Sequence, residues 1–200
     1  MRIQDIMENI DNTARYQKLT AIISKETNLD IPVVYNYNGS TSFGMQHALT
    51  DTNEFDWIYT TGSVELIDVI EQKHMKYFAV QLRNSLVTNE DESWFYDITE
   101  EILNKHGIKM KLTASQLEAY IILHEFGHAD ELYNKYNKDV VSYYTEHYTK
   151  NQELNYQEKL AGHGTKEAWL IHKSKETEQY ADNFACKWLT HILAIVETQV

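Results

Sequence analysis

The five residues from His124 to His128, with the sequence HEFGH, carry the clearest chemistry in the chain. They match the pattern His-Glu-x-x-His, in which two histidines four positions apart project from one face of an α-helix and can bind one metal ion. Glu125 lies about 100° around the helix from His124, so its carboxylate would lie beside the metal's open position and not among the ligands. The pattern predicts a zinc site with His124 and His128 as ligands and Glu125 as general base.

A helix is expected to carry this motif. Ser115 and, three residues later, Glu118 form the pattern of a capping box, and an apolar stretch leads from them into the motif. We therefore expect a helix from about Gln116 to Tyr133. The plain alternative is a helix whose histidines and glutamate lie on the surface by chance.

Two histidines and a water molecule leave a zinc ion one protein ligand short, and Glu178 is the best candidate for it. It opens the segment EQYADNFA, in which Ala181 and Ala185 would let a second helix pack closely against the first. Asp182, one turn after Glu178, would accept a hydrogen bond from the outer ring nitrogen of a ligating histidine. Four other residues remain alternatives for the third ligand: His147, His163, His172 and Glu176.

These two segments resemble the ImmA/IrrE-type zinc metallopeptidases through HExxH and Glu-x-x-Ala-Asn/Asp-x-Phe-Ala. The resemblance implies a zincin-like protein of phage or mobile-element type, with His124, His128 and Glu178 as zinc ligands, Glu125 as general base and Asp182 at the Asn/Asp position. It also implies a cytosolic endopeptidase that acts on a protein. Characterised members are associated with the cleavage or inactivation of DNA-binding repressors.

The chain departs from this family between its two motifs, where it is longer. We expect an insertion at about 134–175, and its aromatic residues at helical spacing favour a helical hairpin packed on the body of the protein. A lid over the cleft, hinged at 162–164, is the alternative. The related metzincin pattern is excluded, because it needs glycine and histidine where the chain has Glu131 and Asn134.

The rest of the chain predicts short strands among helices. The expected elements are helices at about 2–26, 63–74 and 99–107 and strands at 33–37, 55–59 and 77–82. We expect the first two strands to be antiparallel. Either of the last two is expected to be an ordinary sheet strand, and an edge strand that holds an extended substrate is the alternative. With the resemblance, this predicts an α+β zincin-like fold, in which a small antiparallel or mixed sheet packs on the HExxH helix and the second ligand-bearing helix.

Composition and charge narrow the class of protein. The chain has 200 residues, enough for a single domain over 1–200, and its 30 acidic and 18 basic residues give a net charge of −12, which argues against a nucleic-acid surface. No apolar run suggests a signal peptide or a membrane span, so we expect a cytoplasmic protein. The single cysteine, Cys186, is expected to be a buried structural thiol.

The resulting hypothesis is a zinc endopeptidase that cleaves a cytosolic protein, with a regulator as the specific candidate, without binding nucleic acid or membrane. A protein of the same fold that sequesters a regulatory partner without cutting it is the main alternative. In a third hypothesis the metal only stabilises the fold. The donor to the oxyanion of the reaction would be a tyrosine or histidine outside the motif, and the sequence does not select one of its fourteen tyrosines.

Overall fold

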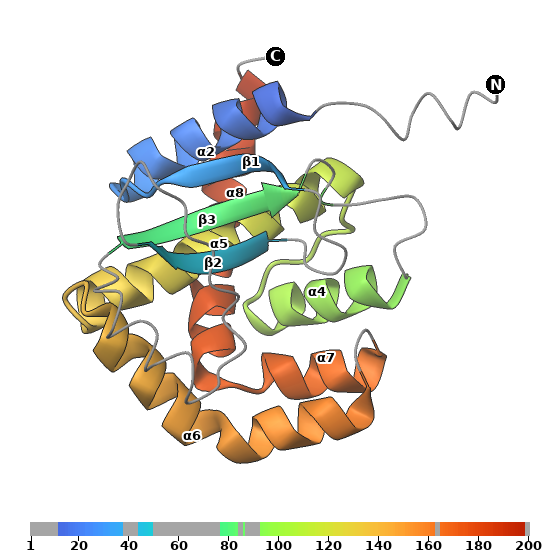
Figure 1. The fold of residues 1–200 in the computed structure, drawn as a ribbon. Helices are drawn as coiled ribbons and strands as arrows, with labels where there is room; N and C mark the ends of the chain where they lie inside the picture. The colour runs from blue at the N-terminus through green and yellow to red at the C-terminus, as the bar shows by residue number, and fades with distance from the viewer. Residues whose placement is uncertain are drawn as a thin grey trace, which may run out of the picture.

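The computed structural model describes residues 12–37, 44–49, 77–83, 86, 93–162 and 165–198. Its helices are α2 (Thr13–Thr27), α4 (Ser93–Lys105), α5 (Ala114–Lys135), α6 (Val140–Ala161), α7 (Lys166–Lys173) and α8 (Glu176–Thr198), as Figure 1 shows. Three short strands are also described: β1 (Val33–Tyr37), β2 (Gly44–Leu49) and β3 (Tyr77–Arg83). None of the described helices has an apolar stretch long enough to cross a lipid bilayer.

The expected α+β zincin-like fold is wrong, because the described chain is organised as a bundle of six helices. The expectation gave weight to the alternating pattern in the first eighty residues. Most of the described residues instead lie in helices after residue 93, and α5 and α8 make the most extensive contact between any two elements. Every residue of the candidate site described below lies on these helices.

The three described strands lie in the order β1-β3-β2, against one side of α5. β1 and β3 begin where the sequence predicted strands, and β1 pairs with β3 in parallel. The strand at 55–59, expected to be antiparallel to 33–37, lies outside the described residues. β3 lies between two strands, and the edge position that was the alternative for 77–82 is therefore wrong. The predicted helix at 63–74 also lies outside the described residues.

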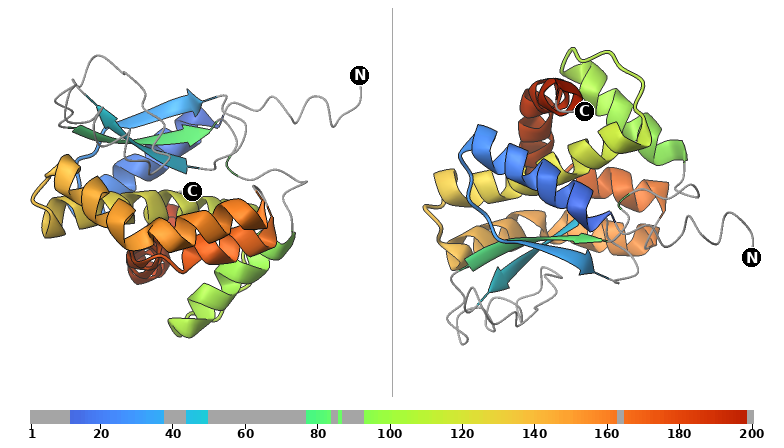
Figure 2. Two further views of the ribbon diagram at one scale, coloured as in Figure 1. Left: turned by 60° about the horizontal axis from the view of Figure 1, so that its bottom comes forward. Right: turned by 90° about the horizontal axis from the view of Figure 1, so that it is seen from above.

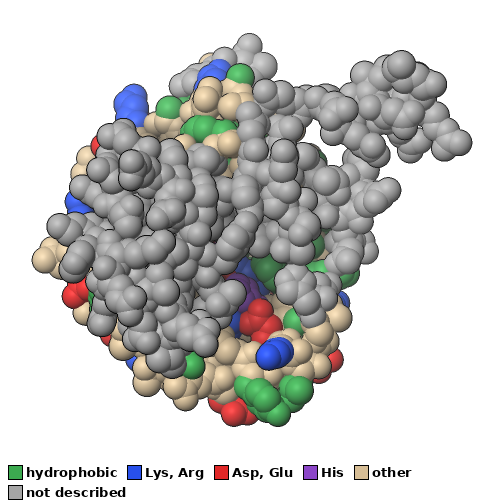
Figure 3. Space-filling model, viewed as in Figure 1, with side chains coloured by type: hydrophobic (Ala, Val, Ile, Leu, Met, Phe, Trp, Pro, Cys, Tyr) green, Lys and Arg blue, Asp and Glu red, His purple; other side chains and the backbone are tan. Residues whose placement is uncertain are grey.

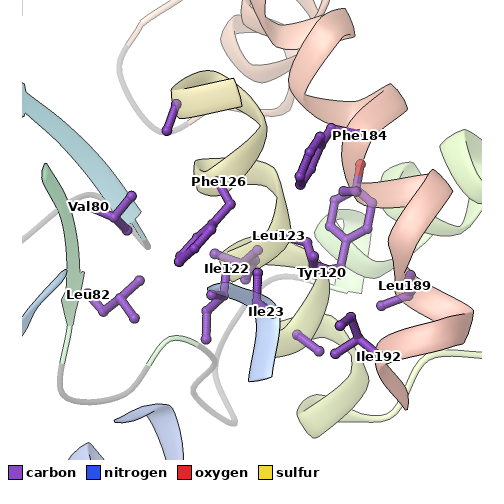
Figure 4. Packing of buried hydrophobic residues seen from close by; sticks show 14 of the residues in the cluster. Ile23, Val80, Leu82, Tyr120, Ile122, Leu123, Phe126, Phe184, Leu189 and Ile192 are labelled. Atoms are coloured by element: carbon purple, nitrogen blue, oxygen red, sulfur yellow. The ribbon is translucent and has the colours of Figure 1, made fainter. Parts of the chain in front are cut away.

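Helix α5 forms the centre of the core, because it is buried on nearly all sides. Figure 4 shows Phe126 pointing toward Val80 and Leu82 of β3, whereas Tyr120 lies toward α8 and its Leu189. These side chains are among the most buried in the described chain. A functional group on α5 is consequently held by packing from both sides.

The capping box of α5 lies two residues earlier than predicted. The side chain of Thr113 accepts a hydrogen bond from the backbone N–H of Gln116, and the Gln116 side chain accepts one from the backbone N–H of Thr113. The predicted pair, Ser115 and Glu118, is therefore wrong, and Glu118 instead accepts a hydrogen bond from the buried hydroxyl of Tyr16. The helix begins at Ala114 and still contains the whole motif.

The segment expected to be an insertion forms two helices, α6 and α7, which lie side by side in both views of Figure 2 and contact each other. This confirms the helical hairpin predicted for 134–175. Gly162 ends α6 with a φ of 89°, a conformation that favours glycine. The other two hinge residues, 163 and 164, lie outside the described residues.

Two other predicted helices differ in where they begin. α2 begins at Thr13 and ends at Thr27, close to the predicted end, and the expected first turns at 2–11 lie outside the described residues. α4 begins at Ser93, six residues before the predicted Thr99, and Gly107 follows its end with a φ of 78°. The buried, unionised Cys186 agrees with the predicted structural thiol, since burial raises the pKa of its thiol to about 12.

Candidate metal centre

Two helices bring the candidate ligands together, α5 with both histidines and α8 with Glu178. They cross closely at Gly127, inside the HExxH motif. A Cβ atom at Gly127 would lie 2.7 Å from Ala181 Cα and 2.9 Å from the Ala181 carbonyl oxygen, which is closer than real Cβ atoms come to other atoms. Glycine at this position therefore lets the backbone of α8 approach the histidine face of α5.

Three buried donor atoms face one another at this crossing. The Nε2 atoms of His124 and His128 are 3.2 Å apart, and Glu178 places Oε2 3.1 Å from His124 Nε2 and Oε1 3.5 Å from His128 Nε2. All three residues are less than 9% exposed. Among the described residues, this is the one group of histidine, cysteine and acidic side chains with the spacing to hold a metal ion.

The spacing of these atoms fits a tetrahedral ion. Ligand atoms at about 2.0 to 2.2 Å from a shared ion lie about 3.3 to 3.6 Å from one another in tetrahedral geometry. The two Nε2 atoms are 3.2 Å apart and His124 Nε2 lies 3.1 Å from Glu178 Oε2, close to this range, while His128 Nε2 lies 3.5 Å from the other carboxylate oxygen, Oε1. One ligand atom from each residue lies within 4.8 Å of the other two. The group can therefore hold one metal ion and leave a coordination position for another ligand.

The charge of the surrounding residues also calls for a cation. Glu125, Glu178 and Asp182 are buried, and Lys173 forms ion pairs with Glu178 and Asp182. With the imidazoles neutral and all three carboxyl groups ionised, three carboxylates and one ammonium give a net charge of −2. Uncompensated charge is costly inside a protein, and a divalent cation would neutralise this group. Figure 3 shows histidine, acidic and basic side chains meeting in one recess of the surface.

The outer nitrogen of His124 has the partner predicted for it. His124 Nδ1 lies 2.8 Å from Asp182 Oδ1, which also accepts a hydrogen bond of 2.7 Å from the hydroxyl of Tyr120. A carboxylate in this position holds the ring with Nδ1 protonated and directs the lone pair of Nε2 toward the ion. Asp182 is thus a positioning residue and not a ligand.

His128 has a different outer partner, which sequence reasoning missed. Its Nδ1 lies 3.1 Å from Thr177 Oγ1, and Thr177 donates a hydrogen bond of 3.0 Å to the buried carboxylate of Glu131. The hydroxyl of Tyr143, from α6, also lies 3.1 Å from Thr177 Oγ1. Thr177 directly precedes Glu178, so one turn of α8 supplies both a ligand and the support for another ligand.

The two histidines hold protons very differently in the metal-free chain. Burial and Lys173 oppose a charge on His124, but Asp182 and Glu178 outweigh them and raise its pKa to about 9. Burial lowers the pKa of His128 to about 3. Burial also opposes the charge of Glu178, yet the surrounding His172, His128 and Lys173 hold its pKa well below the usual range. At neutral pH one proton on His124 supplies part of the missing positive charge.

Glu125 is buried beside the ligands without being one of them. Burial raises the pKa of its carboxyl group to about 7. The hydroxyl of Tyr144, from α6, is sensitive to the charge of Glu125 and is buried without a hydrogen-bond partner among the described residues. A carboxylate with a pKa near 7 exchanges protons readily at neutral pH, as a general base must.

Helix α7 adds two residues to the centre that the predicted set did not contain. His172 Nε2 lies 3.1 Å from Glu178 Oε1, so His172 supports the third ligand and does not replace it. Lys173 Nζ lies 2.9 Å from Asp182 Oδ1 and 3.4 Å from Glu178 Oε2. His172 was among the alternative ligands, whereas no motif in the sequence pointed to Lys173. Helix α7 of the hairpin therefore forms one side of the candidate metal centre.

The remaining alternative ligands are not in the group. His147 Nε2 lies 3.3 Å from Glu131 Oε2 and is not part of the group. Glu176 is exposed and pairs with Lys150. His163 lies outside the described residues. Within the part of the chain that the structure describes, the predicted His124, His128 and Glu178 thus come together and no other candidate set does.

Comparison with known proteins finds no relative: no protein-family model, no curated protein and no solved structure matches the chain.

Proposed function

We propose that the chain is a zinc-dependent peptidase with His124, His128 and Glu178 as ligands and Glu125 as general base. The observation that carries this proposal is the convergence of three buried side chains, whose ligand atoms lie within 4.8 Å of one another, beside the buried carboxyl group of Glu125. Ligands drawn from two imidazoles and one carboxylate are typical of catalytic zinc, whereas structural zinc usually has four protein ligands and favours cysteine.

A zinc ion bound there would polarise the substrate carbonyl and acidify a water molecule. Glu125 would accept a proton from the attacking water and later deliver it to the leaving amine, because its carboxyl group is buried beside the ligands. Asp182 and Thr177 would keep the two rings oriented through the reaction. The bundle supplies a rigid frame, because α5 is packed on nearly all sides.

The substrate class is inferred from the resemblance of the two motif segments to the ImmA/IrrE-type metallopeptidases. We infer a protein substrate, with a DNA-binding regulator as the specific candidate. This inference rests on the residues of the two motifs alone, since no known family matches the chain. The net charge of −12 is consistent with a basic protein partner.

The test uses the whole chain loaded with one equivalent of Zn²⁺. Fluorescein-labelled casein and a mixture of unstructured peptides serve as substrates, and mass spectrometry identifies the products. We expect cleavage by the wild type and a rate at least about 100-fold lower for Glu125→Gln, because a general base contributes that much. Zinc content should be equal in the two proteins. Glu118→Gln is the matched control, since Glu118 is buried on the same helix but binds Tyr16.

The other hypotheses predict different results. Equal cleavage by wild type and Glu125→Gln would contradict the role of Glu125. A zinc-loaded wild type that cleaves none of the probes, but holds a protein partner intact as well as Glu125→Gln does, would favour sequestration without hydrolysis. Unfolding on removal of zinc with EDTA would favour a structural metal. A folded but inactive metal-free chain is the result we expect.

A further inference from the structure

Lys173 brings a positive charge to the edge of a site that is built to hold a cation. Its Nζ lies 3.3 Å from His124 Nε2 and 3.4 Å from Glu178 Oε2. These are the same separations as those among the three candidate ligand atoms themselves, 3.1 to 3.5 Å. The ammonium group of Lys173 therefore lies next to the ligand atoms, in contact with those of His124 and Glu178.

The ammonium is held in this place by two contacts that do not involve the ligands. Lys173 donates a hydrogen bond of 2.9 Å to Asp182 Oδ1, and its Nζ lies 5.3 Å from the centre of the Trp169 ring. Its side chain is 10% exposed. A desolvated ammonium attracts negative charge more strongly than one in water. Because Asp182 is its shortest contact, Lys173 would stay bound to Asp182 when a divalent ion binds Glu178.

Lys173 is also reached from outside the ligand group. Together with Asp182 it lines a cavity of about 420 Å³ between α4, α7 and α8. Ile98, Ile102 and Leu170 supply the apolar part of its lining, and polar or charged residues, Glu101, Lys105 and His106 among them, line the rest. A molecule in this cavity would place an apolar group against the apolar residues and a polar group against the ammonium.

We propose that Lys173 and this cavity form a substrate subsite, in which the ammonium binds the oxygen that becomes negatively charged and the apolar wall takes the adjoining hydrophobic group. The proposal rests on the proposed function and adds a substrate class to it, a peptide with an aliphatic side chain next to the reacting carbonyl. If Lys173 only neutralised Asp182, its ammonium group would not need to lie next to ligand atoms of both His124 and Glu178.

The test measures ligand binding to the Co²⁺-loaded chain by its visible absorption, without any peptide hydrolysis. Three probes are compared: acetohydroxamate, an anionic chelator; isovalerohydroxamate, the same anion with a branched apolar group; and imidazole, a neutral ligand. In Lys173→Met we expect both hydroxamates to bind about tenfold more weakly, because a charged hydrogen bond is lost. Imidazole affinity should stay within about twofold. In the wild type, isovalerohydroxamate should bind more tightly than acetohydroxamate.

Lys175→Met is the matched control, because Lys175 is equally buried but its ammonium lies 2.6 Å from Glu158. It should bind all three probes as the wild type does. If Lys173→Met does not fold, Lys173→Gln, which keeps a donor for Asp182, replaces it with the same expected loss. Hydroxamate affinity that is unchanged or higher in the Lys173 variant would overturn the proposal, since it would mean that the ammonium is only a competitor for the site.

The result also separates this proposal from the peptidase proposal. Loss of hydroxamate binding in Lys173→Met, in a protein that cleaves no peptide, would support the subsite and contradict hydrolysis. Casein cleavage with hydroxamate binding that is independent of Lys173 would contradict the subsite alone. A chain that binds no Co²⁺ would overturn both.

Discussion

His124 and His128 lie one helical turn apart, yet their surroundings differ. His124 faces the carboxylates of Asp182 and Glu178, whereas the outer partner of His128 is the neutral hydroxyl of Thr177. The metal-free chain therefore places a proton on one ring and keeps the other neutral. A metal ion must displace that proton before it can bind both rings.

Metal affinity should consequently depend on pH. Between pH 6 and 8 His124 is protonated in the metal-free chain, because its pKa is about 9, so each bound ion releases at least about one proton. Affinity should rise about tenfold for each pH unit over this range. Competition with a chelator of known affinity at pH 6, 7 and 8 measures it. Affinity that does not change with pH would show that His124 is neutral and that its surroundings are misassigned.

Two tyrosines with buried hydroxyl groups, Tyr16 and Tyr144, differ in the partners of these groups. Tyr16 donates a hydrogen bond of 2.7 Å to Glu118 and accepts one of 2.9 Å from the N–H of Leu86, whereas the hydroxyl of Tyr144 has no partner among the described residues. Tyr16→Phe should lower the free energy of unfolding by about 1 to 3 kcal/mol, and Tyr144→Phe should leave it unchanged or raise it. Urea unfolding of both variants checks this. An equal loss in both would contradict the assigned contacts.

At the scale of the elements, the crossing of α5 and α8 decides whether the centre exists. The histidines share one helix, so their spacing is fixed by helical geometry alone. Glu178 lies on another helix, fifty residues after His128 in the sequence. Its distance from the histidines depends on how closely the two helices approach each other. Gly127 and Ala181 set that approach.

Gly127→Ala tests this crossing by the sign of its effect. Helix propensity alone predicts that alanine stabilises α5 by up to about 1 kcal/mol. The contact of 2.7 Å with the backbone of Ala181 predicts the opposite, a loss of about 1 to 3 kcal/mol, because α8 must move away. Metal affinity should fall with it. Thermal unfolding and metal titration measure the two effects, and a stabilised variant with full metal affinity would contradict the close crossing.

Local patterns predicted these two helices well. HExxH needs only helical spacing to place its side chains, and the alanines at 181 and 185 indicated a close-packed partner. The capping box was misplaced because Ser115 and Glu118 match the pattern as well as Thr113 and Gln116 do. The identity of the outer partner of His128 was not predictable, since Thr177 is reached only through tertiary packing.

At the scale of the whole molecule, the sequence did not predict how the elements assemble. The expected fold class came from alternating residues before position 83 and from the resemblance, while the described body is a helical bundle. The role of α7 was missed for a related reason. His172 and Lys173 reach the centre only because α7 folds back along α6. No short sequence pattern predicts that contact. Nonlocal contacts of this kind override local pattern.

Acid should destabilise the whole chain through buried carboxylates. Burial opposes the charge of Glu131, but hydrogen bonds from His147, Lys135 and Thr177 lower its pKa to about 2. Since the pKa in the unfolded chain is about 4.3, Glu131 contributes stability that is complete above pH 5 and is lost as the pH falls toward 2. The loss should be on the order of 3 kcal/mol.

Glu131→Gln should flatten this part of the stability curve, and urea unfolding between pH 7 and 3 would show it. Glu153→Gln, an exposed change on α6, is the control and should leave the curve as it is. A Glu131→Gln protein that loses stability with acid as steeply as the wild type would exclude Glu131 as a main cause.

X-ray absorption at the zinc edge tests the metal centre most directly, on the chain titrated with one equivalent of Zn²⁺. We predict one ion per chain, with the scattering pattern of two imidazole nitrogens and with oxygen ligands at about 2.0 to 2.2 Å. Glu178→Ala should lose one oxygen ligand and bind more weakly, and His124→Ala should lose one imidazole. A wild-type chain that binds no zinc, or binds it without two imidazoles, would contradict the account.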